Sequence, residues 1–273
     1  MHPDTWRLII TSPNNGAWNM ALDEAIFNTT AKKIQPPTLR LYAWSPYCLS
    51  LGYAQNIGEV NQEALTAEGW DLVRRPTGGR AILHADELTY SVCAPLSNPH
   101  IQGGVIESYR RLSNILLLAL GKLEVIADSK PKNNEEKHLA KDPVCFQYPS
   151  DYEITYNRKK IIGSAQARKA NALLQHGSIP LTGDITRILK VLNFDSEEKR
   201  NETRKKLIAR ASTLEEVTGI EISPEEATKA IIEAFEERLY IKFIQESVSD
   251  LEFSETQKLI KDKYAHPRWT ERI

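Results

Sequence analysis

Short apolar runs separated by turn residues dominate the first hundred residues and predict a series of strands. Branched and aromatic residues cluster within these runs, and Gly, Pro, Asn or Ser lie between them. The expected strands are residues 7–10, 38–44, 48–53, 71–75, 81–84 and 88–94. Ser45 and Pro46 mark a turn between the second and third of these strands.

Helical spacing of apolar residues appears twice in the same half of the chain. Alanines and a methionine recur on one side of residues 16–27, and Asn15 or Gly16 precedes them as a start signal. Residues 61–70 predict a shorter helix that ends at Gly69. Both helices are expected to pack one apolar face against the strands.

Longer helices are predicted further along the chain. Residues 105–120 carry a broad apolar face, and Gly121 follows in a position to cap the helix end. Ser223 is expected to start another helix, because a proline and Glu226 follow it at capping-box spacing. A last helix is expected to start in the same way within residues 254–257.

Three strands in close succession predict an antiparallel unit. They are residues 152–156, 159–169 and 172–181, and Asn157 with Arg158 forms a tight turn between the first two. Strands joined by so few residues must run antiparallel. Strands in hairpins with a few helices indicate an α+β fold rather than a doubly wound sheet.

The length of 273 residues suits one large domain with a small addition. We expect a main domain at residues 1–212 and a small helical appendage at 213–273 that packs on it, since the second segment alone would have little core. Residues 128–142 contain almost nothing apolar to bury, which predicts a surface loop. The sequence leaves open whether this loop acts as a lid.

Charge and cysteine content exclude several classes of protein. Lys and Arg number 35 against 36 Asp and Glu, which argues against a nucleic-acid-binding protein. Cys48, Cys93 and Cys145 have neither a disulfide pattern nor metal-ligand spacing, which favours a reducing compartment. The first twelve residues lack a signal-peptide pattern, and the longest apolar run, residues 115–120, is too short to cross a membrane. We therefore expect a cytoplasmic protein with no membrane partner.

The sequence RRPTGGR is the first candidate for chemistry. Gly78 and Gly79 remove two β-carbons, so the chain can bend sharply and a ligand can approach backbone N–H groups. Arg74, Arg75 and Arg80 could hold a carboxylate or phosphate by charge-assisted hydrogen bonds. The alternative is an ordinary hairpin turn whose arginines face solvent.

Cys145 is the second candidate, because a thiol beside a cation can become a nucleophile. Lys159 and Lys160 follow the next strand and its turn, and the hairpin could bring one of them to the same end of the sheet. A free cysteine more often only packs in the core. Cys48 and Cys93 lie in apolar strands and are expected to do so.

Small and polar residues inside the later strands form the third candidate. Residues 163–165 read Gly-Ser-Ala within an apolar strand, which indicates either a bulge or a close approach by a ligand. Gln166, Gln175, His176 and, earlier in the chain, His84 add polar groups that could also make only cross-strand hydrogen bonds. Three such features in one chain favour a pocket.

Motifs for cofactors and metals do not occur in the sequence. It contains no P-loop, no HExxH and no GxSxG, and its histidines and cysteines have no metal-ligand spacing. We therefore expect neither a bound cofactor nor a metal ion.

Several of these stretches together resemble the lipoate–biotin protein ligase superfamily, and most closely its octanoyltransferase branch. The similar stretches, in order, are NMALDEAI, LRLYAWSPYCLSLGYAQN, RRPTGGRAILHADELTYSV, CFQYPSDYEI, RKKIIGSAQARKANALLQHGSIPL and KYAHPRWTERI. A cysteine in CFxxPS about fifteen residues before KxxGSAQ is the most specific of these features.

The resemblance implies a mixed, mostly antiparallel sheet of the biotin/lipoate ligase type with flanking helices. It implies that Cys145 carries an acyl group as a thioester and that Lys160, rather than Lys159, lowers the pKa of its thiol. The substrate-binding residues that it implies are Arg74, Arg75, Thr77, Gly78, Gly79, Arg80, Ala81, His84, Gly163, Ser164, Ala165, Gln166, His176 and Gly177.

The implied activity is transfer of an octanoyl group from acyl carrier protein to a lysine of a lipoyl-carrier protein, such as a glycine cleavage H protein, by a monomer. Ligases of the superfamily carry a third glycine after TGG, where an adenylate phosphate lies, and this chain has Arg80 there. The difference favours transfer over ATP-dependent ligation. An amidotransferase acting between lipoyl domains and a non-catalytic binder of acylated carrier protein stay open as alternatives.

Overall fold

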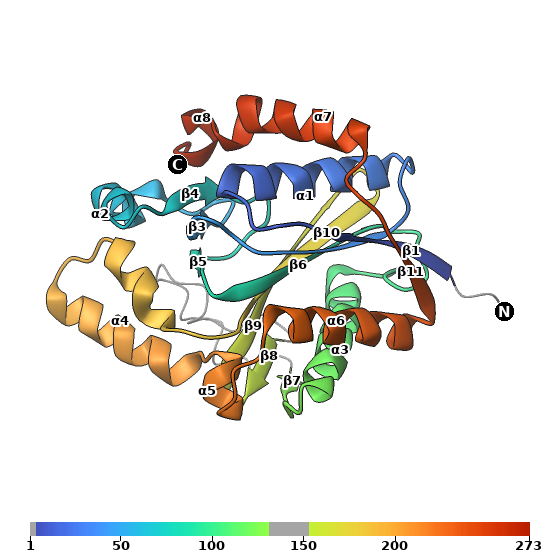
Figure 1. The fold of residues 1–273 in the computed structure, drawn as a ribbon. Helices are drawn as coiled ribbons and strands as arrows, with labels where there is room; N and C mark the ends of the chain where they lie inside the picture. The colour runs from blue at the N-terminus through green and yellow to red at the C-terminus, as the bar shows by residue number, and fades with distance from the viewer. Residues whose placement is uncertain (1–3, 131–152) are drawn as a thin grey trace.

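The computed structural model describes residues 4–130 and 153–273, and its largest element is an eight-stranded sheet (Figure 1). β11, β1 and β2 run parallel to one another, and every other neighbouring pair is antiparallel. In spatial order the strands are β11 (Ile241–Gln245), β1 (Asp4–Ile10), β2 (Thr38–Tyr42), β6 (Glu87–Pro95), β10 (Ala172–Pro180), β9 (Lys159–Lys169), β8 (Glu153–Tyr156) and β7 (Asp128–Lys130). The prediction of a mixed, mostly antiparallel sheet is confirmed.

A second, three-stranded sheet holds the segment around the two adjacent glycines. β3 (Cys48–Leu51) lies between β4 (Asp71–Arg74), to which it is parallel, and β5 (Ile82–His84), to which it is antiparallel. The chain from Arg75 to Ala81 therefore connects two strands that flank the same neighbour. This connection is longer than a hairpin turn and faces the large sheet.

Helices cover both faces of the large sheet. Neighbouring residues of each strand point to opposite sides, and apolar residues on both sides pack against helices. On one side, Ile9, Cys93 and Leu174 pack with helix α1 (Gly16–Ala31). On the other side, alternate strand residues pack with α3 (Val105–Lys122) and α6 (Pro224–Leu239). The remaining α-helices are α2 (Gln62–Ala67), α4 (Glu197–Arg210), α5 (Leu214–Thr218), α7 (Asp250–Leu259) and α8 (Pro267–Thr270).

Two-residue turns fix the register of the central hairpins as the sequence predicts. Asn157 and Arg158 both take positive φ between β8 and β9, and Ala170 and Asn171 do so between β9 and β10. Such turns match the right-handed twist of the flanking strands. They place Ser164 opposite Gly177.

The boundaries of α3 and α7 differ from the prediction. α3 continues through Gly121 to Lys122, and Glu124 takes the positive φ that ends the segment. α7 begins at Asp250, where Ser249 and Glu252 form a capping box, so the start expected within 254–257 is wrong. By contrast, the predicted start signal Asn15 and the capping box at Ser223 are both confirmed.

The expected surface loop at 128–142 is wrong at its beginning. Asp128–Lys130 forms β7, which pairs with β8 at the edge of the sheet. The remainder, residues 131–142, lies outside the described residues. Cys145 also lies outside them.

The segment 213–273 contributes to the large sheet and to the main core. β11 pairs with β1, and Phe235 of α6 is fully buried in the same cluster as Leu8 and Leu39. The predicted boundary at residue 212 stays a prediction. Among the described helices, none is both long and apolar enough to cross a membrane.

Because α6 shares the core with β1 and β2, Phe235→Ala should destabilise the whole molecule. We expect a loss of about 3–5 kcal/mol in the free energy of unfolding, as for other buried aromatic deletions. Urea unfolding followed by circular dichroism should still show one transition. The control Ile220→Ala, at a position that is 67% exposed, should change the free energy by less than about 0.5 kcal/mol. A separate early transition for the C-terminal segment would contradict this expectation.

Candidate active site

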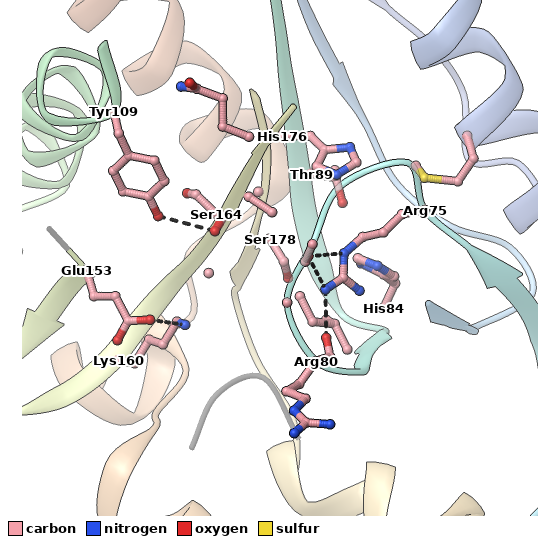
Figure 2. A pocket seen from close by; sticks show the side chains of 18 of the residues that line it. Arg75, Arg80, His84, Thr89, Tyr109, Glu153, Lys160, Ser164, His176 and Ser178 are labelled. Carbon is pink, nitrogen blue, oxygen red and sulfur yellow. Dashed lines mark hydrogen bonds and ion pairs between the residues drawn. The ribbon is translucent and has the colours of Figure 1, made fainter. Parts of the chain in front are cut away.

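A cavity of about 440 Å³ lies between the two sheets and the first turn of α3. Its size falls within the range of small-molecule sites, roughly 300–1,000 Å³. Figure 2 shows Lys160 and Tyr109 on one side of it and His84 and Arg75 on the other. The apolar and aromatic part of its lining consists of Met20, Tyr42, Trp44, Ile82, Val105, Ile106 and Tyr109.

The cavity brings together most of the residues that the resemblance implied for substrate binding. Those that line it are Arg75, Gly78, Gly79, Arg80, His84, Lys160, Gly163, Ser164, Ala165, Gln166, His176 and Gly177. Arg74, Thr77 and Ala81 are buried behind this surface and are not part of the lining. The three predicted candidate regions, except for Cys145, thus meet at one place.

The first two arginines of RRPTGGR hold backbone in place. Arg74 donates hydrogen bonds to the carbonyls of Gly52, Gln55 and Thr270. Arg75 donates to the carbonyls of Ser50, Gly78 and Arg80, so its guanidinium fastens its own loop to β3. These two arginines therefore neither face solvent in a hairpin turn nor serve only to bind a carboxylate or phosphate.

Arg80, the third arginine, lies at the cavity wall with a partly exposed side chain. Its guanidinium forms an ion pair with Glu59 at 3.3 Å. Both partners are about 30% exposed, so solvent screens their attraction and the pair contributes little to stability. Arg80 therefore adds bulk and positive charge to the wall of the cavity.

Two of the glycines that the resemblance implied for substrate binding, Gly78 and Gly177, have different physical surroundings. A β-carbon at Gly78 would meet no atom of the described residues within 4 Å, so this glycine borders the open space of the cavity. A β-carbon at Gly177 would lie 2.6 Å from the Tyr90 ring and 2.7 Å from the carbonyl oxygen of Gly163. Gly177 is thus required by the packing of β6, β9 and β10.

His176 links the buried helix α1 to the loop that carries the glycines. Its Nδ1 lies 3.1 Å from the Asp23 carboxylate, and its Nε2 lies 2.7 Å from the hydroxyl of Thr77. Burial lowers the pKa of His176, although the Asp23 carboxylate acts against this. Burial alone would raise the pKa of Asp23, but Arg40 and the hydrogen bond with His176 lower it overall. A neutral imidazole between an anion and a hydroxyl thus fixes the position of Thr77.

His84 is held by a second chain of the same kind. Its Nδ1 lies 2.7 Å from Glu87 Oε1, and its Nε2 lies 2.8 Å from the hydroxyl of Ser50. The imidazole stacks on Trp44 at 4.0 Å between ring centroids. Both histidines have a carboxylate on Nδ1 and a hydroxyl on Nε2, so each is oriented before any ligand binds.

The small-residue strand forms the opposite wall of the cavity. The Ser164 hydroxyl lies 2.7 Å from the hydroxyl of Tyr90, and the Ser164 carbonyl accepts a hydrogen bond from Tyr109 at 3.2 Å. The Gln166 amide donates to Gln175 and to Ser108. The polar residues of β9 and β10 are therefore largely satisfied within the protein and give the wall a fixed shape.

Lys160 is buried in the cavity wall beside an acidic partner. The side chain of Lys160 is 4% exposed, and its ammonium group forms an ion pair with Glu153, whose side chain is 6% exposed. The predicted neighbour Cys145 lies outside the described residues, so the pairing of Cys145 with Lys160 stays a prediction. The other two cysteines, Cys48 and Cys93, are buried free thiols whose pKa is raised by burial.

Sequence reasoning missed Glu153 and the two aliphatic side chains at the cavity mouth. The sequence could have predicted the position of Glu153. The turn at Asn157 sets Thr155 opposite Lys160, and Glu153, two residues before Thr155, lies on the same face of the hairpin. Val105 and Ile106 were expected in the core but are more than half exposed. Their position at the cavity depends on tertiary packing and had no local signal.

Among the described residues, no group of three or more His, Cys, Asp or Glu side chains could hold a metal ion. The cavity combines apolar walls, a buried ammonium group and pre-oriented histidines. These properties define a protein of the α+β class with a cavity that suits a small, partly apolar ligand near a basic group.

The family of the chain follows from its comparison with known proteins. Residues 15–236 match the lipoyl protein ligase A/B catalytic domain, and the chain belongs to this family. A relative from Kyrpidia tusciae, named octanoyltransferase LipM, is 41% identical and aligns over 98% of this chain and 99% of its own length. The octanoyltransferase LipM of Bacillus subtilis is 38% identical, with the same coverage. The resemblance seen in the sequence is thus confirmed.

Solved structures of lipoate protein ligases share the fold. A bi-partite lipoate protein ligase from Thermoplasma acidophilum superposes with a TM-score of 0.80 at 26% identity, covering 98% of this chain and 96% of the other. A lipoate-protein ligase A bound with ATP gives a TM-score of 0.79 at 25% identity, with 99% of each chain covered. The predicted ligase-type architecture is confirmed by both.

The different surroundings of two glycines provide a matched test of the cavity. Gly78→Ala should leave stability unchanged, because its methyl group meets open space, but should raise the KM for a ligand that fills the cavity. Gly177→Ala should lower the free energy of unfolding by about 1–3 kcal/mol through overpacking. Urea unfolding and steady-state kinetics measure the two effects. Equal stability of the two variants would contradict this assignment.

Proposed function

We propose that the protein transfers an octanoyl group from octanoyl-acyl carrier protein to a lysine of a lipoyl-carrier protein, such as a glycine cleavage H-type protein. The acyl group would pass through a thioester on Cys145, in a step of lipoate biosynthesis. The observation that carries this proposal is the ammonium group of Lys160, buried in the wall of a largely apolar cavity. The octanoyltransferase relatives support the choice of acyl group.

The first half-reaction uses Lys160 to generate a thiolate and to donate a proton. A free thiol is mostly protonated at neutral pH, and a neighbouring cation favours the thiolate. The Cys145 sulfur forms a bond to the octanoyl carbonyl carbon, and the bond from that carbon to the carrier sulfur breaks. The carrier thiolate takes a proton from Lys160, which leaves a neutral lysine beside the acyl-enzyme.

The second half-reaction returns that proton. The neutral ε-amine of the acceptor lysine attacks the Cys145 thioester, an amide bond forms, and the carbon–sulfur bond breaks. Lys160 accepts the proton released from the attacking nitrogen, and the thiolate and ammonium pair is restored. One difficult transfer is thereby divided into two easier ones.

The walls of the cavity suit the two ends of this substrate. Trp44, Met20 and Ile82 offer apolar surface for a hydrocarbon chain, while Lys160 and β9 lie where the thioester would react. Backbone N–H groups around residues 163–166 are candidates to stabilise the developing oxyanion. No binding site for a cofactor is part of this proposal.

ATP-dependent ligation is the second candidate function, since a ligase of the same fold binds ATP. Arg80 argues against it, because the resemblance implies a glycine at this position in ligases, and here an arginine side chain paired with Glu59 occupies the cavity wall. A carrier-bound thioester is already activated and needs no ATP. Transfer therefore fits the site better than ligation.

The proposed partners are proteins, and no nucleic acid or membrane takes part. The acceptor is a lipoyl domain, in keeping with the E2 lipoyl domain that the Thermoplasma ligase structure includes in its lipoylation system. We propose a monomer in the cytoplasm, where the buried thiols of Cys48 and Cys93 would stay reduced.

Cys145→Ala and Cys145→Ser should abolish transfer, whereas Cys48→Ala and Cys93→Ala should retain it. Intact-mass measurement after incubation with octanoyl-acyl carrier protein, without ATP, should show an octanoyl adduct on the wild type and none on Cys145→Ala. Parallel samples with octanoate plus ATP, and with octanoylated lipoyl domain, separate the transferase from a ligase and from an amidotransferase. Full activity of Cys145→Ala would rule out the covalent route.

Lys160→Arg should lower the transfer rate by roughly 10²–10⁴-fold, the usual contribution of a group that exchanges protons. Arginine keeps the positive charge but does not release a proton near neutral pH, so the pH–rate profile should lose its alkaline limb. Lys159→Arg is the matched control, because this neighbour points to the other face of β9. A profile of unchanged shape in Lys160→Arg would leave Lys160 without an acid–base role.

A further inference from the structure

Glu153 and Lys160 form one of the few ion pairs of the described chain in which both side chains are almost fully buried. Both side chains line the cavity, and Figure 2 shows the Glu153 carboxylate directed at the Lys160 ammonium. A buried charge without a partner is strongly unfavourable. The pair therefore accounts for the presence of a charged lysine in this apolar wall.

The backbone around Lys160 is fixed on both sides, which limits where its side chain can reach. Lys160 pairs with Thr155 of β8, and on its other side it forms a bridge with Ala211, beyond the end of α4. The Lys160 carbonyl accepts a hydrogen bond from the Ser212 N–H at 3.1 Å. Glu153 lies two residues before Thr155 on the same face, so its carboxylate reaches the ammonium from the neighbouring strand.

The proposed reaction changes the charges around Lys160 during each cycle. Before acylation a thiolate would share its positive charge, but the thioester is neutral and cannot do so. When Lys160 takes up the proton of the attacking amine, before the cysteine sulfur has left, its ammonium group needs another anion. Glu153 is an anion of this kind that is independent of the state of the cysteine.

The other titratable groups in the described lining of the cavity do not include a second carboxylate. The described lining also contains Tyr42, Arg75, Arg80, His84, Tyr109 and His176, and Arg210 precedes the bridge residue Ala211. None of these groups is a carboxylate, so Glu153 is the one carboxylate in the described lining of the cavity. The carboxylates of Asp23 and Glu87 bind the two histidines instead.

We propose that Glu153 is a positioning residue that holds the Lys160 side chain in the cavity throughout the reaction and sets the pH at which its ammonium group gives up its proton. This inference rests on the proposed function, because it assigns Glu153 a role in the proton exchange of Lys160. Glu153 takes no direct part in the bond changes and proton transfers proposed for Cys145 and Lys160.

The test is the pH–rate profile of octanoyl transfer from octanoyl-acyl carrier protein to a lipoyl domain. In Glu153→Gln the anion that favours the ammonium form is lost, so the alkaline limb should move to lower pH by about 1–3 units. Glu153→Asp keeps the charge and should return the limb to within about half a unit of the wild type. An alkaline limb that does not move in folded Glu153→Gln would overturn the inference.

Glu252→Gln is the matched control, because it breaks another buried ion pair, with Arg7, away from the cavity. It should lower thermal stability but leave the pH profile in place, which separates a structural effect from a positioning effect. If Glu153→Gln does not fold, the double variant Glu153→Gln with Lys160→Gln should fold again, because it removes both charges. Failure of the double variant to recover stability would also overturn the inference.

The proposed function and the role of Glu153 can fail independently of each other. If the wild type forms no octanoyl adduct, the thioester route fails whatever Glu153 does. If the adduct forms and Lys160→Arg behaves as expected, an unmoved profile in Glu153→Gln rejects the role of Glu153 alone.

Discussion

A single buried carboxylate, Asp23, ties together the parts of the protein that form the cavity. It accepts hydrogen bonds from Arg40 of β2, Tyr42 of β2, Ser91 of β6 and His176 of β10. Four donors and the charge of Arg40 compensate for its complete burial. Through His176 and Thr77 the same network reaches the glycine loop. Helix, sheet and loop therefore share one polar centre, and the apolar cavity lies directly beside it.

The use of the arginines explains why this cavity is apolar although its sequence looked cationic. Arg74 lies behind the wall and donates to carbonyl groups, and Arg75, which lines the cavity, also spends hydrogen bonds on carbonyl groups of its own loop. The described lining of the cavity combines the backbone at Gly78, aliphatic and aromatic side chains, polar groups that are bonded within the protein, and the pair of Lys160 with Glu153. Such a site suits an uncharged acyl chain whose one reactive end is held near a proton donor.

Features set by local sequence could be predicted, and features set by distant contacts could not. The hairpin at Asn157 and the capping box at Ser223 depend on neighbouring residues, and both were predicted. The start of α7 was missed because Ser249 and Ser254 both begin capping patterns, and tertiary packing selects the first. The role of Arg74 was hidden for the same reason, since its acceptors come from residues 52–55 and 269–270. The octanoyltransferase activity predicted from the motifs agrees with the names of full-length relatives, whereas Cys145 stays a prediction.

The position of β1 between β2 and β11 has a consequence for the order of folding. Trp6 lies beside Phe243 in the register of β1 and β11, so two segments from opposite ends of the chain are direct neighbours (Figure 1). Long-range pairing of this kind slows folding, because a large loop must close before the contact forms. During synthesis β1 has an unpaired edge until β11 has been made, and exposed strand edges recruit other chains. A newly made chain thus depends on protection of its first strand until the sheet is complete.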